Sequence, residues 1–209
     1  MDNIETWTLR FEKYLGGCEF DDSSHDIGHF RRVWKTANAI ADNDVDRLVL
    51  LASSYFHDIV SYPKNHPKRS RSSVDSAIKA AEILAQMNFP QEKIDKVKHC
   101  IEAHSFSANI RPETIEAKIL QDADRMEALG AIGLARTFYV AGRLNSKLFD
   151  EEDLFAQKRA LDDSKYALDH FQVKLLKLPE TMQTDKGQLE AGRRVEILKS
   201  FMHHLSLEL

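Results

Sequence analysis

The residue types most able to do chemistry in this sequence are an adjacent histidine and aspartate, His57-Asp58, at the end of an apolar run. Another histidine, His29, lies upstream of the pair, and an aspartate, Asp124, lies far downstream. Imidazole nitrogens and carboxylate oxygens are the ligands that hydrolytic divalent metals accept. Because an unpaired carboxylate inside an apolar run is costly, a bound cation explains the pair better than packing does. These four residues therefore predict a metal site.

Two of these residues also have a purely structural interpretation. His29 lies on one helical stripe with Val33 and Ala37, so its ring faces the interior as a core histidine would. Asp58 could cap the turn that follows it. The adjacency of His57 and Asp58 favours metal chemistry over both alternatives.

A second pair of carboxylates, Asp122 and Asp124, is separated by helix geometry. Residues two apart differ by about 200° around a helix, so only one of the two can face a shared site. Asp122 has Lys118 four residues before it and Arg125 three after it, which predicts a solvated ion-pair face and a structural or supporting role. Asp124 instead shares a stripe with apolar residues, including Leu120, and is the better candidate ligand.

Helical periodicity runs through almost the whole chain, and this predicts an all-α fold. The 8 glycines and 5 prolines in 209 residues are few, which also favours helices, and the length suits one sizeable core. Residues 62–72 break the pattern with prolines and positive charge. We expect helices over residues 4–15, 26–40, 45–56, 73–87, 90–103, 112–124 with a continuation toward 141, 151–158, 162–178 and 186–207.

Composition excludes several classes of partner. The net charge of -4 gives no general attraction to a nucleic acid polymer or to anionic lipid. No apolar run approaches the roughly 20 residues of a membrane span, and the first residues lack the features of a signal peptide. Cys18 and Cys100 are too few for a disulfide framework and are expected to be thiols. We therefore expect a cytoplasmic protein.

The chemical residues, taken in order, carry a family resemblance. His29 followed by Arg31-Arg32-Val33, then His57-Asp58, then Asp122-Ala123-Asp124-Arg125-Met126 resembles the HD-domain superfamily of metal-dependent phosphohydrolases. The spacing is most similar to the small stand-alone bacterial members, some of which act on nucleotides. No Gly-Tyr-Pro element of the cyclic-dinucleotide phosphodiesterase branch is present, so we set that branch aside.

The resemblance implies a domain organisation and a ligand set. It implies a single all-helical HD domain over residues 1–209, in which a motif core of about 26–142 is followed by C-terminal helices, 151–207, that pack on it. It also implies that the metal ligands are His29, His57, Asp58 and Asp124, the positions that helix geometry favours. Such a ligand set suits Mn²⁺ first, with Mg²⁺, Fe²⁺, Co²⁺ and Ni²⁺ as alternatives.

Four residues are candidates for catalysis. Asp58 could orient or deprotonate the attacking water, and Lys64, Arg69 and His104 could stabilise charge on the phosphoryl group, His104 also as an acid. Lys64 and Arg69 lie in a loop with four cations, which is alternatively only a solvated loop. His99 and His104 would differ by about 140° in one helix, so they do not share a second metal. We expect an exposed His99 and a mononuclear site.

The function that we predict is metal-dependent hydrolysis of a phosphoester or phosphoanhydride bond, with a nucleotide as the small phosphorylated substrate. The nucleotide follows only from the resemblance. The alternatives are a nucleotide-sensing regulatory module with little turnover, an iron-dependent oxygenase of the HD type, and a helical protein without a metal. The sequence allows either a monomer or a homodimer.

Overall fold

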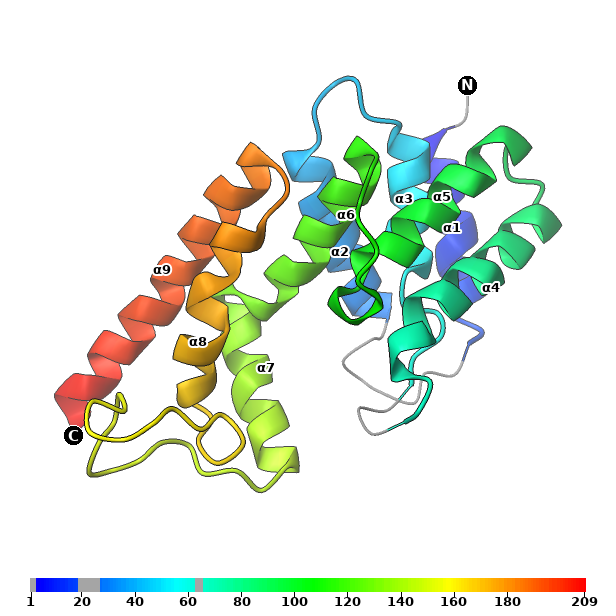
Figure 1. The fold of residues 1–209 in the computed structure, drawn as a ribbon. Helices are drawn as coiled ribbons and strands as arrows, with labels where there is room; N and C mark the ends of the chain where they lie inside the picture. Colours follow the sequence, from blue (N-terminus) through cyan, green and yellow to red (C-terminus); the bar gives the residue numbers. More distant parts are fainter. Residues whose placement is uncertain (1–2, 19–26, 63–65) are drawn as a thin grey trace. The chain divides into compact units, whose positions relative to one another are not determined.

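The computed structural model describes residues 3–18, 27–62 and 66–209, and Figure 1 shows that these residues form helices joined by loops. Within these residues there is no strand, only one isolated bridge between Lys147 and Tyr166. The predicted all-α class is therefore confirmed. The chain divides into two compact units, Met1–Asp124 and Arg125–Leu209, which are described in turn. The organisation as a single domain stays a prediction.

Helices of the first unit lie within three residues of the expected ranges, and α3 is the central one. Their bounds are α1 Ile4–Leu15, α2 Ile27–Ile40, α3 Arg47–Phe56, α4 Ser72–Gln86, α5 Gln91–His104 and α6 Ile115–Arg125. α3 packs against α1, α2, α4 and α5.

The burial of α3 follows from its sequence. Every residue from Leu48 to Phe56 is buried, because the helix is apolar all round. Asp46 caps its first turn, where the carboxylate accepts hydrogen bonds from the backbone of Leu48 and Val49. α3 ends at Phe56 and His57 is its C-cap, so the His57-Asp58 pair stands at the carboxyl end of the most buried helix of the first unit.

The expected helix from Pro112 toward Ala141 is in fact two helices, and this part of the prediction was wrong. α6 begins at Ile115, where the Thr114 hydroxyl accepts a hydrogen bond from the backbone of Ala117. It ends at Arg125 and is followed by the 3₁₀ turn Met126–Ala128. Gly130 has a φ of 69°, a conformation that glycine adopts without strain, and this residue starts the next helix.

The second unit has its own helices and its own core. α7, Gly130–Arg143, packs against α9, Asp185–Glu208, and α9 packs against the 3₁₀ segment Leu175–Thr181. The short helix α8, Asp169–Val173, contributes Phe171 to a cluster with Phe138 of α7 and Phe201 of α9, with ring centroids 5.6 to 6.1 Å apart.

Between α7 and α8 the predicted helix over residues 151–158 is absent, and the one over 162–178 is reduced to α8 and the 3₁₀ segment. Aspartate side chains take the backbone N–H groups that a helix would have used. The Asp153 carboxylate accepts hydrogen bonds from Gln157, Lys158 and Arg159, and that of Asp162 accepts from residues 164 and 165. These local bonds hold the chain in turns.

None of the described helices combines the length and the apolar character that crossing a bilayer requires.

Candidate metal centre

The ring of His57 is fixed by the backbone of the helix that it ends. Its Nδ1 lies 3.0 Å from the carbonyl oxygen of Ser54, three residues earlier. A hydrogen bond there places the proton on Nδ1 and directs Nε2 away from α3. A metal-binding histidine is commonly oriented by such a bond to a backbone carbonyl. The ring is fully buried, so its Nε2 faces other side chains.

Two of those side chains are His29 and Asp124, which come from α2 and α6. The Nε2 atoms of His29 and His57 lie 3.1 Å apart. Asp124 Oδ1 lies 3.7 Å from His29 Nε2 and 3.6 Å from His57 Nε2. Three residues distant in the sequence therefore converge, as their types and spacing predicted.

Asp58 completes this side of the cluster. Its Oδ2 lies 3.7 Å from His57 Nε2. The side chains of Asp58 and Asp124 are 18% and 28% exposed, whereas those of His29 and His57 are at most 1% exposed. The imidazoles thus form the buried side of the cluster, and the carboxylates form its solvent-accessible side.

Electrostatics in the absence of a cation favour a proton on His57. Burial lowers the pKa of this imidazole, but the charge of Asp58 and a hydrogen bond with Asp124 raise it, to about 9. Burial raises the pKa of Asp124, but the hydrogen bond and the positive charge of His57 outweigh this effect. The pKa of Asp124 therefore lies well below its ordinary value. The cluster therefore stabilises positive charge between two carboxylates.

The donor set and its distances fit a divalent metal ion. Two ligand atoms that are each about 2.1 Å from one ion are roughly 3.0–3.5 Å apart at the angles that proteins provide. Among His29, His57 and Asp124 the distances of 3.1 to 3.7 Å are close to that range. Asp58 comes this close only to His57, at 3.7 Å, and is grouped with His57 and His104 rather than with His29 and Asp124. His29, His57 and Asp124 each offer one atom, and these atoms lie within 4.8 Å of one another.

His104 lies on the other side of Asp58. Its Nε2 is 3.4 Å from Asp58 Oδ1, and its ring meets that of His57 edge to face, with centroids 4.8 Å apart. His57, Asp58 and His104 form a second group of possible ligands. Nδ1 of His57 is engaged with a backbone carbonyl, so only its Nε2 is directed toward the two groups. His104 is thus a neighbour of Asp58, and a mononuclear site stays a prediction.

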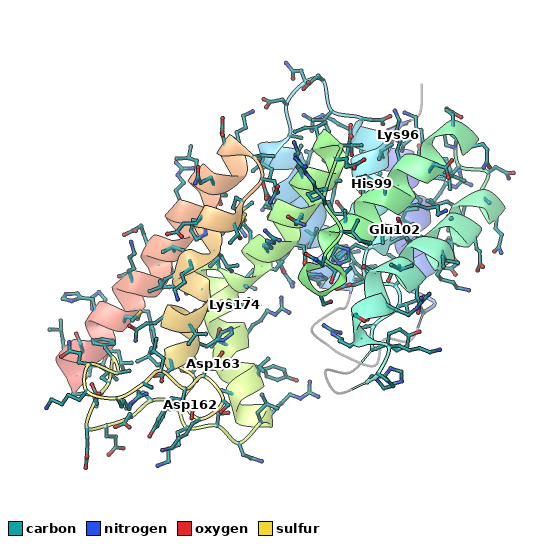
Figure 2. The ribbon with its side chains drawn as sticks, in the orientation of Figure 1. Lys96, His99, Glu102, Asp162, Asp163 and Lys174 are labelled. Atoms are coloured by element: carbon teal, nitrogen blue, oxygen red, sulfur yellow. The ribbon has the colours of Figure 1, made fainter. Side chains whose placement is uncertain are left out.

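His99 takes no part in the cluster. Figure 2 shows His99 between Lys96 and Glu102 along α5, on the face that these two residues share. Its Nε2 accepts a hydrogen bond from the backbone of Glu113 at 3.0 Å. The ring is half-buried by this contact, so the prediction of an exposed His99 was wrong.

Asp122 also differs from its prediction. Its side chain is fully buried, so the expectation that it lies on a solvated face was wrong. α6 buries every residue from Glu116 to Ala123 except Lys118, a wider face than a single apolar stripe would cover. Sequence spacing predicted the direction in which Asp124 points, but it did not predict how much of the surface of α6 is buried.

The basic loop gives a mixed outcome. Lys64 lies outside the described residues. Arg69 donates a hydrogen bond from Nη1 to the carbonyl oxygen of Tyr62 at 2.6 Å, so in this structure it braces the loop. Arg71 pairs with Asp75 at 3.2 Å in the same region. A role for Lys64 and Arg69 in binding phosphate stays a prediction.

Sequence reasoning missed two buried polar residues near the cluster, Gln121 and Ser73. Gln121 donates a hydrogen bond to the carbonyl oxygen of Ala103, and Ser73 donates one to that of Glu102. The signal for Gln121 was present, because an amide one turn before Asp124 stands on a face that is otherwise apolar.

Comparisons with known proteins identify the family to which this chain is similar. A sequence model of the HD domain matches residues 26–129, which contain all four proposed ligands. The YpgQ protein of Bacillus subtilis, itself uncharacterized, is 31% identical to this chain over 197 residues, covering 90% of this chain and 86% of YpgQ.

Solved structures are similar over nearly the whole length. The crystal structure of YpgQ in complex with ADP has a TM-score of 0.71 and 28% sequence identity, covering 99% of this chain and 94% of that chain. An HD-superfamily hydrolase from Bacillus thuringiensis has a TM-score of 0.76 and 27% identity, covering 99% and 98% of the two chains.

Proposed function

The chain belongs to the HD-domain superfamily, and from this premise we propose that it is a metal-dependent hydrolase of phosphoester or phosphoanhydride bonds, with nucleotides as substrates. One observation carries the proposal. Two buried imidazoles and two partly exposed carboxylates converge around Nε2 of His57, with distances of 3.1 to 3.7 Å.

In this proposal His29, His57, Asp58 and Asp124 hold the ion, which is Mn²⁺ or another divalent metal. A divalent cation supplies Lewis-acid chemistry there, because it polarises a phosphoryl oxygen and makes water a stronger nucleophile at neutral pH. The buried histidines would hold the ion, and the partly exposed carboxylates would face the substrate.

The residues of the chain then orient the substrate and move protons. Asp58 is placed to accept a proton from the attacking water, since its carboxylate is partly exposed at the rim of the cluster. His104, with Nε2 at 3.4 Å from Asp58 Oδ1, can receive that proton or donate one to the leaving oxygen. Lys64 and Arg69 are proposed to bind phosphoryl oxygens.

The nucleotide class is supported by a relative. YpgQ, of similar fold and 28% identical in that comparison, forms a complex with ADP. A phosphoanhydride of this kind presents the adjacent anionic oxygens that a cation and nearby basic side chains bind together.

Phosphate release from nucleoside mono-, di- and triphosphates tests the proposal. We expect turnover with Mn²⁺, its loss on chelation, and a decrease of about 100-fold or more in kcat for Asp58→Asn, which keeps the side-chain shape. Separating orthophosphate from pyrophosphate as products identifies the bond that is cleaved.

Other outcomes would contradict the proposal in specific ways. Full activity of Asp58→Asn would exclude the mechanism. Nucleotide binding with thermal stabilisation but without product would favour the sensing module, and iron-dependent oxygen uptake would favour the oxygenase.

A further inference from the structure

The carboxyl end of α5, which carries His104, is held by side chains from three places. The last carbonyl groups of a helix have no partner inside the helix. Here the carbonyl oxygen of Ile101 accepts from His104 Nδ1 at 2.6 Å, that of Glu102 from the Ser73 hydroxyl at 3.1 Å, and that of Ala103 from Gln121 Nε2 at 2.8 Å.

These bonds determine what His104 presents to the cluster. The bond to Ile101 places the proton of a neutral ring on Nδ1 and leaves Nε2 to face Asp58. Ala103 precedes His104, so the bond from Gln121 anchors the peptide group that joins the two residues. Movement of this peptide would change the distance of 3.4 Å between His104 and Asp58.

Gln121 is an unusual choice for a residue that only packs. Its side chain is 4% exposed, and its Oε1 has no hydrogen-bond partner among the described residues. The amide satisfies the Ala103 carbonyl but leaves its own Oε1 unpaired, so an apolar side chain of similar shape would exchange one unpaired buried acceptor for another at little net change in stability. Stability alone therefore does not explain an amide at this position.

We propose that Gln121 is a positioning residue for His104: its amide N–H fixes the end of α5 so that Nε2 of His104 faces Asp58. This inference rests on the proposed function, because His104 is assigned there to proton transfer. Gln121 lies three residues before Asp124 on α6, so one helix positions both the proposed ligand and the histidine.

The substitution Gln121→Met tests this role with little change in volume. We expect kcat to fall about 10-fold, as is common when a group that orients a site residue is removed, while KM and the thermal unfolding midpoint change little. Gln91→Met is the matched control, because Gln91 is exposed at the start of α5, and it should leave kcat unchanged. Ser73→Ala, which removes the partner of the neighbouring carbonyl, should lower kcat in the same direction.

A double-mutant cycle separates positioning from a general loss of structure. If Gln121 acts through His104, adding Gln121→Met to His104→Gln should cause no further loss of kcat. If Gln121→Met lowers kcat by the same factor in the His104→Gln variant as in the wild type, the two residues act independently and the proposal is overturned.

A second readout does not need turnover. In crystal structures of the protein without added metal, the peptide that joins Ala103 and His104 should move in Gln121→Met, so that the distance between His104 Nε2 and Asp58 Oδ1 departs from 3.4 Å. An unchanged distance in the variant would overturn the positioning role even if no substrate were found. If the wild type releases no phosphate but this distance changes in Gln121→Met, the proposed function is overturned and the positioning role is supported.

Discussion

At the scale of single residues, Asp124 is the proposed ligand that faces both imidazoles at once. Its Oδ1 lies 3.6 and 3.7 Å from the two Nε2 atoms. Because a ligand that binds only the folded state stabilises it, Mn²⁺ at about 100 times its Kd should add about 2.7 kcal/mol, or roughly 5–10 °C in the unfolding midpoint. We expect Asp124→Ala to abolish this shift, as measured by thermal denaturation with and without Mn²⁺.

The control for this prediction is Asp95→Asn, at an exposed position on α5. This variant removes the same formal charge and should retain the full metal-induced shift. A shift of wild-type size in Asp124→Ala would exclude Asp124 from the ligand set.

At this scale the sequence predicted which residues cluster, but it did not predict the hydrogen bonds that hold them in place. A doublet such as His57-Asp58 in an apolar run has few explanations besides a bound cation. Helix periodicity favoured Asp124 over Asp122 only because the two side chains point in different directions. The contact between Gln121 and Ala103 joins two helices, so it depends on how α5 and α6 pack. Periodicity within one helix contains no information on that packing.

At the scale of elements, Asp46 connects the start of α3 to two other helices. Its carboxylate caps α3 and pairs with Lys93 of α5, and its backbone N–H donates to Glu116 of α6 at 3.0 Å. Burial raises the pKa of Asp46, but the hydrogen bonds from Lys93 and from the backbone N–H groups lower it by more. The net shift of this pKa is therefore downward. Asp46→Ala should therefore lower the free energy of unfolding by about 1–2 kcal/mol at neutral pH.

This difference should depend on pH with a defined sign. A carboxylate whose pKa is lowered in the folded protein contributes stability above its unfolded pKa of about 3.9, and that contribution disappears as the pH falls. The difference between wild type and Asp46→Ala should thus shrink between pH 5 and pH 3 in urea denaturation. Asp44→Asn, at an exposed neighbouring position, serves as the control; a difference that grows on acidification would contradict the prediction.

The same chemistry explains the elements that the sequence did not predict. Residues 151–158 are charged and have helix-compatible spacing, but Asp150 and Asp153 bind backbone N–H groups of residues 152–153 and 157–159. Arg159 then reaches Asp169, which is fully buried. The two residues of this ion pair are ten positions apart and meet only in the folded loop. Local helix propensity therefore could not predict that the segment forms turns.

At the scale of the whole molecule, the chain is two compact units, and every proposed metal ligand belongs to the first, Met1–Asp124. The second unit has its own aromatic cluster of Phe138, Phe171 and Phe201. We therefore expect metal to stabilise the first unit directly, and a lesion in the core of the second to leave metal binding intact.

Gly133 offers such a lesion. A Cβ atom there would lie 2.2 Å from the backbone carbonyl of Ala128, a contact that only backbone movement can relieve. Gly133→Ala should lower the stability of the second unit by more than about 2 kcal/mol. Gly142 on the same helix is the matched control, since a Cβ there meets nothing within 4 Å, and Gly142→Ala should stabilise α7 by about 0.5–1 kcal/mol. In calorimetry of Gly133→Ala, the transition that responds to Mn²⁺ should keep its shift while another transition moves to lower temperature. Loss of the Mn²⁺ response in this variant would show that the metal centre needs an intact second unit.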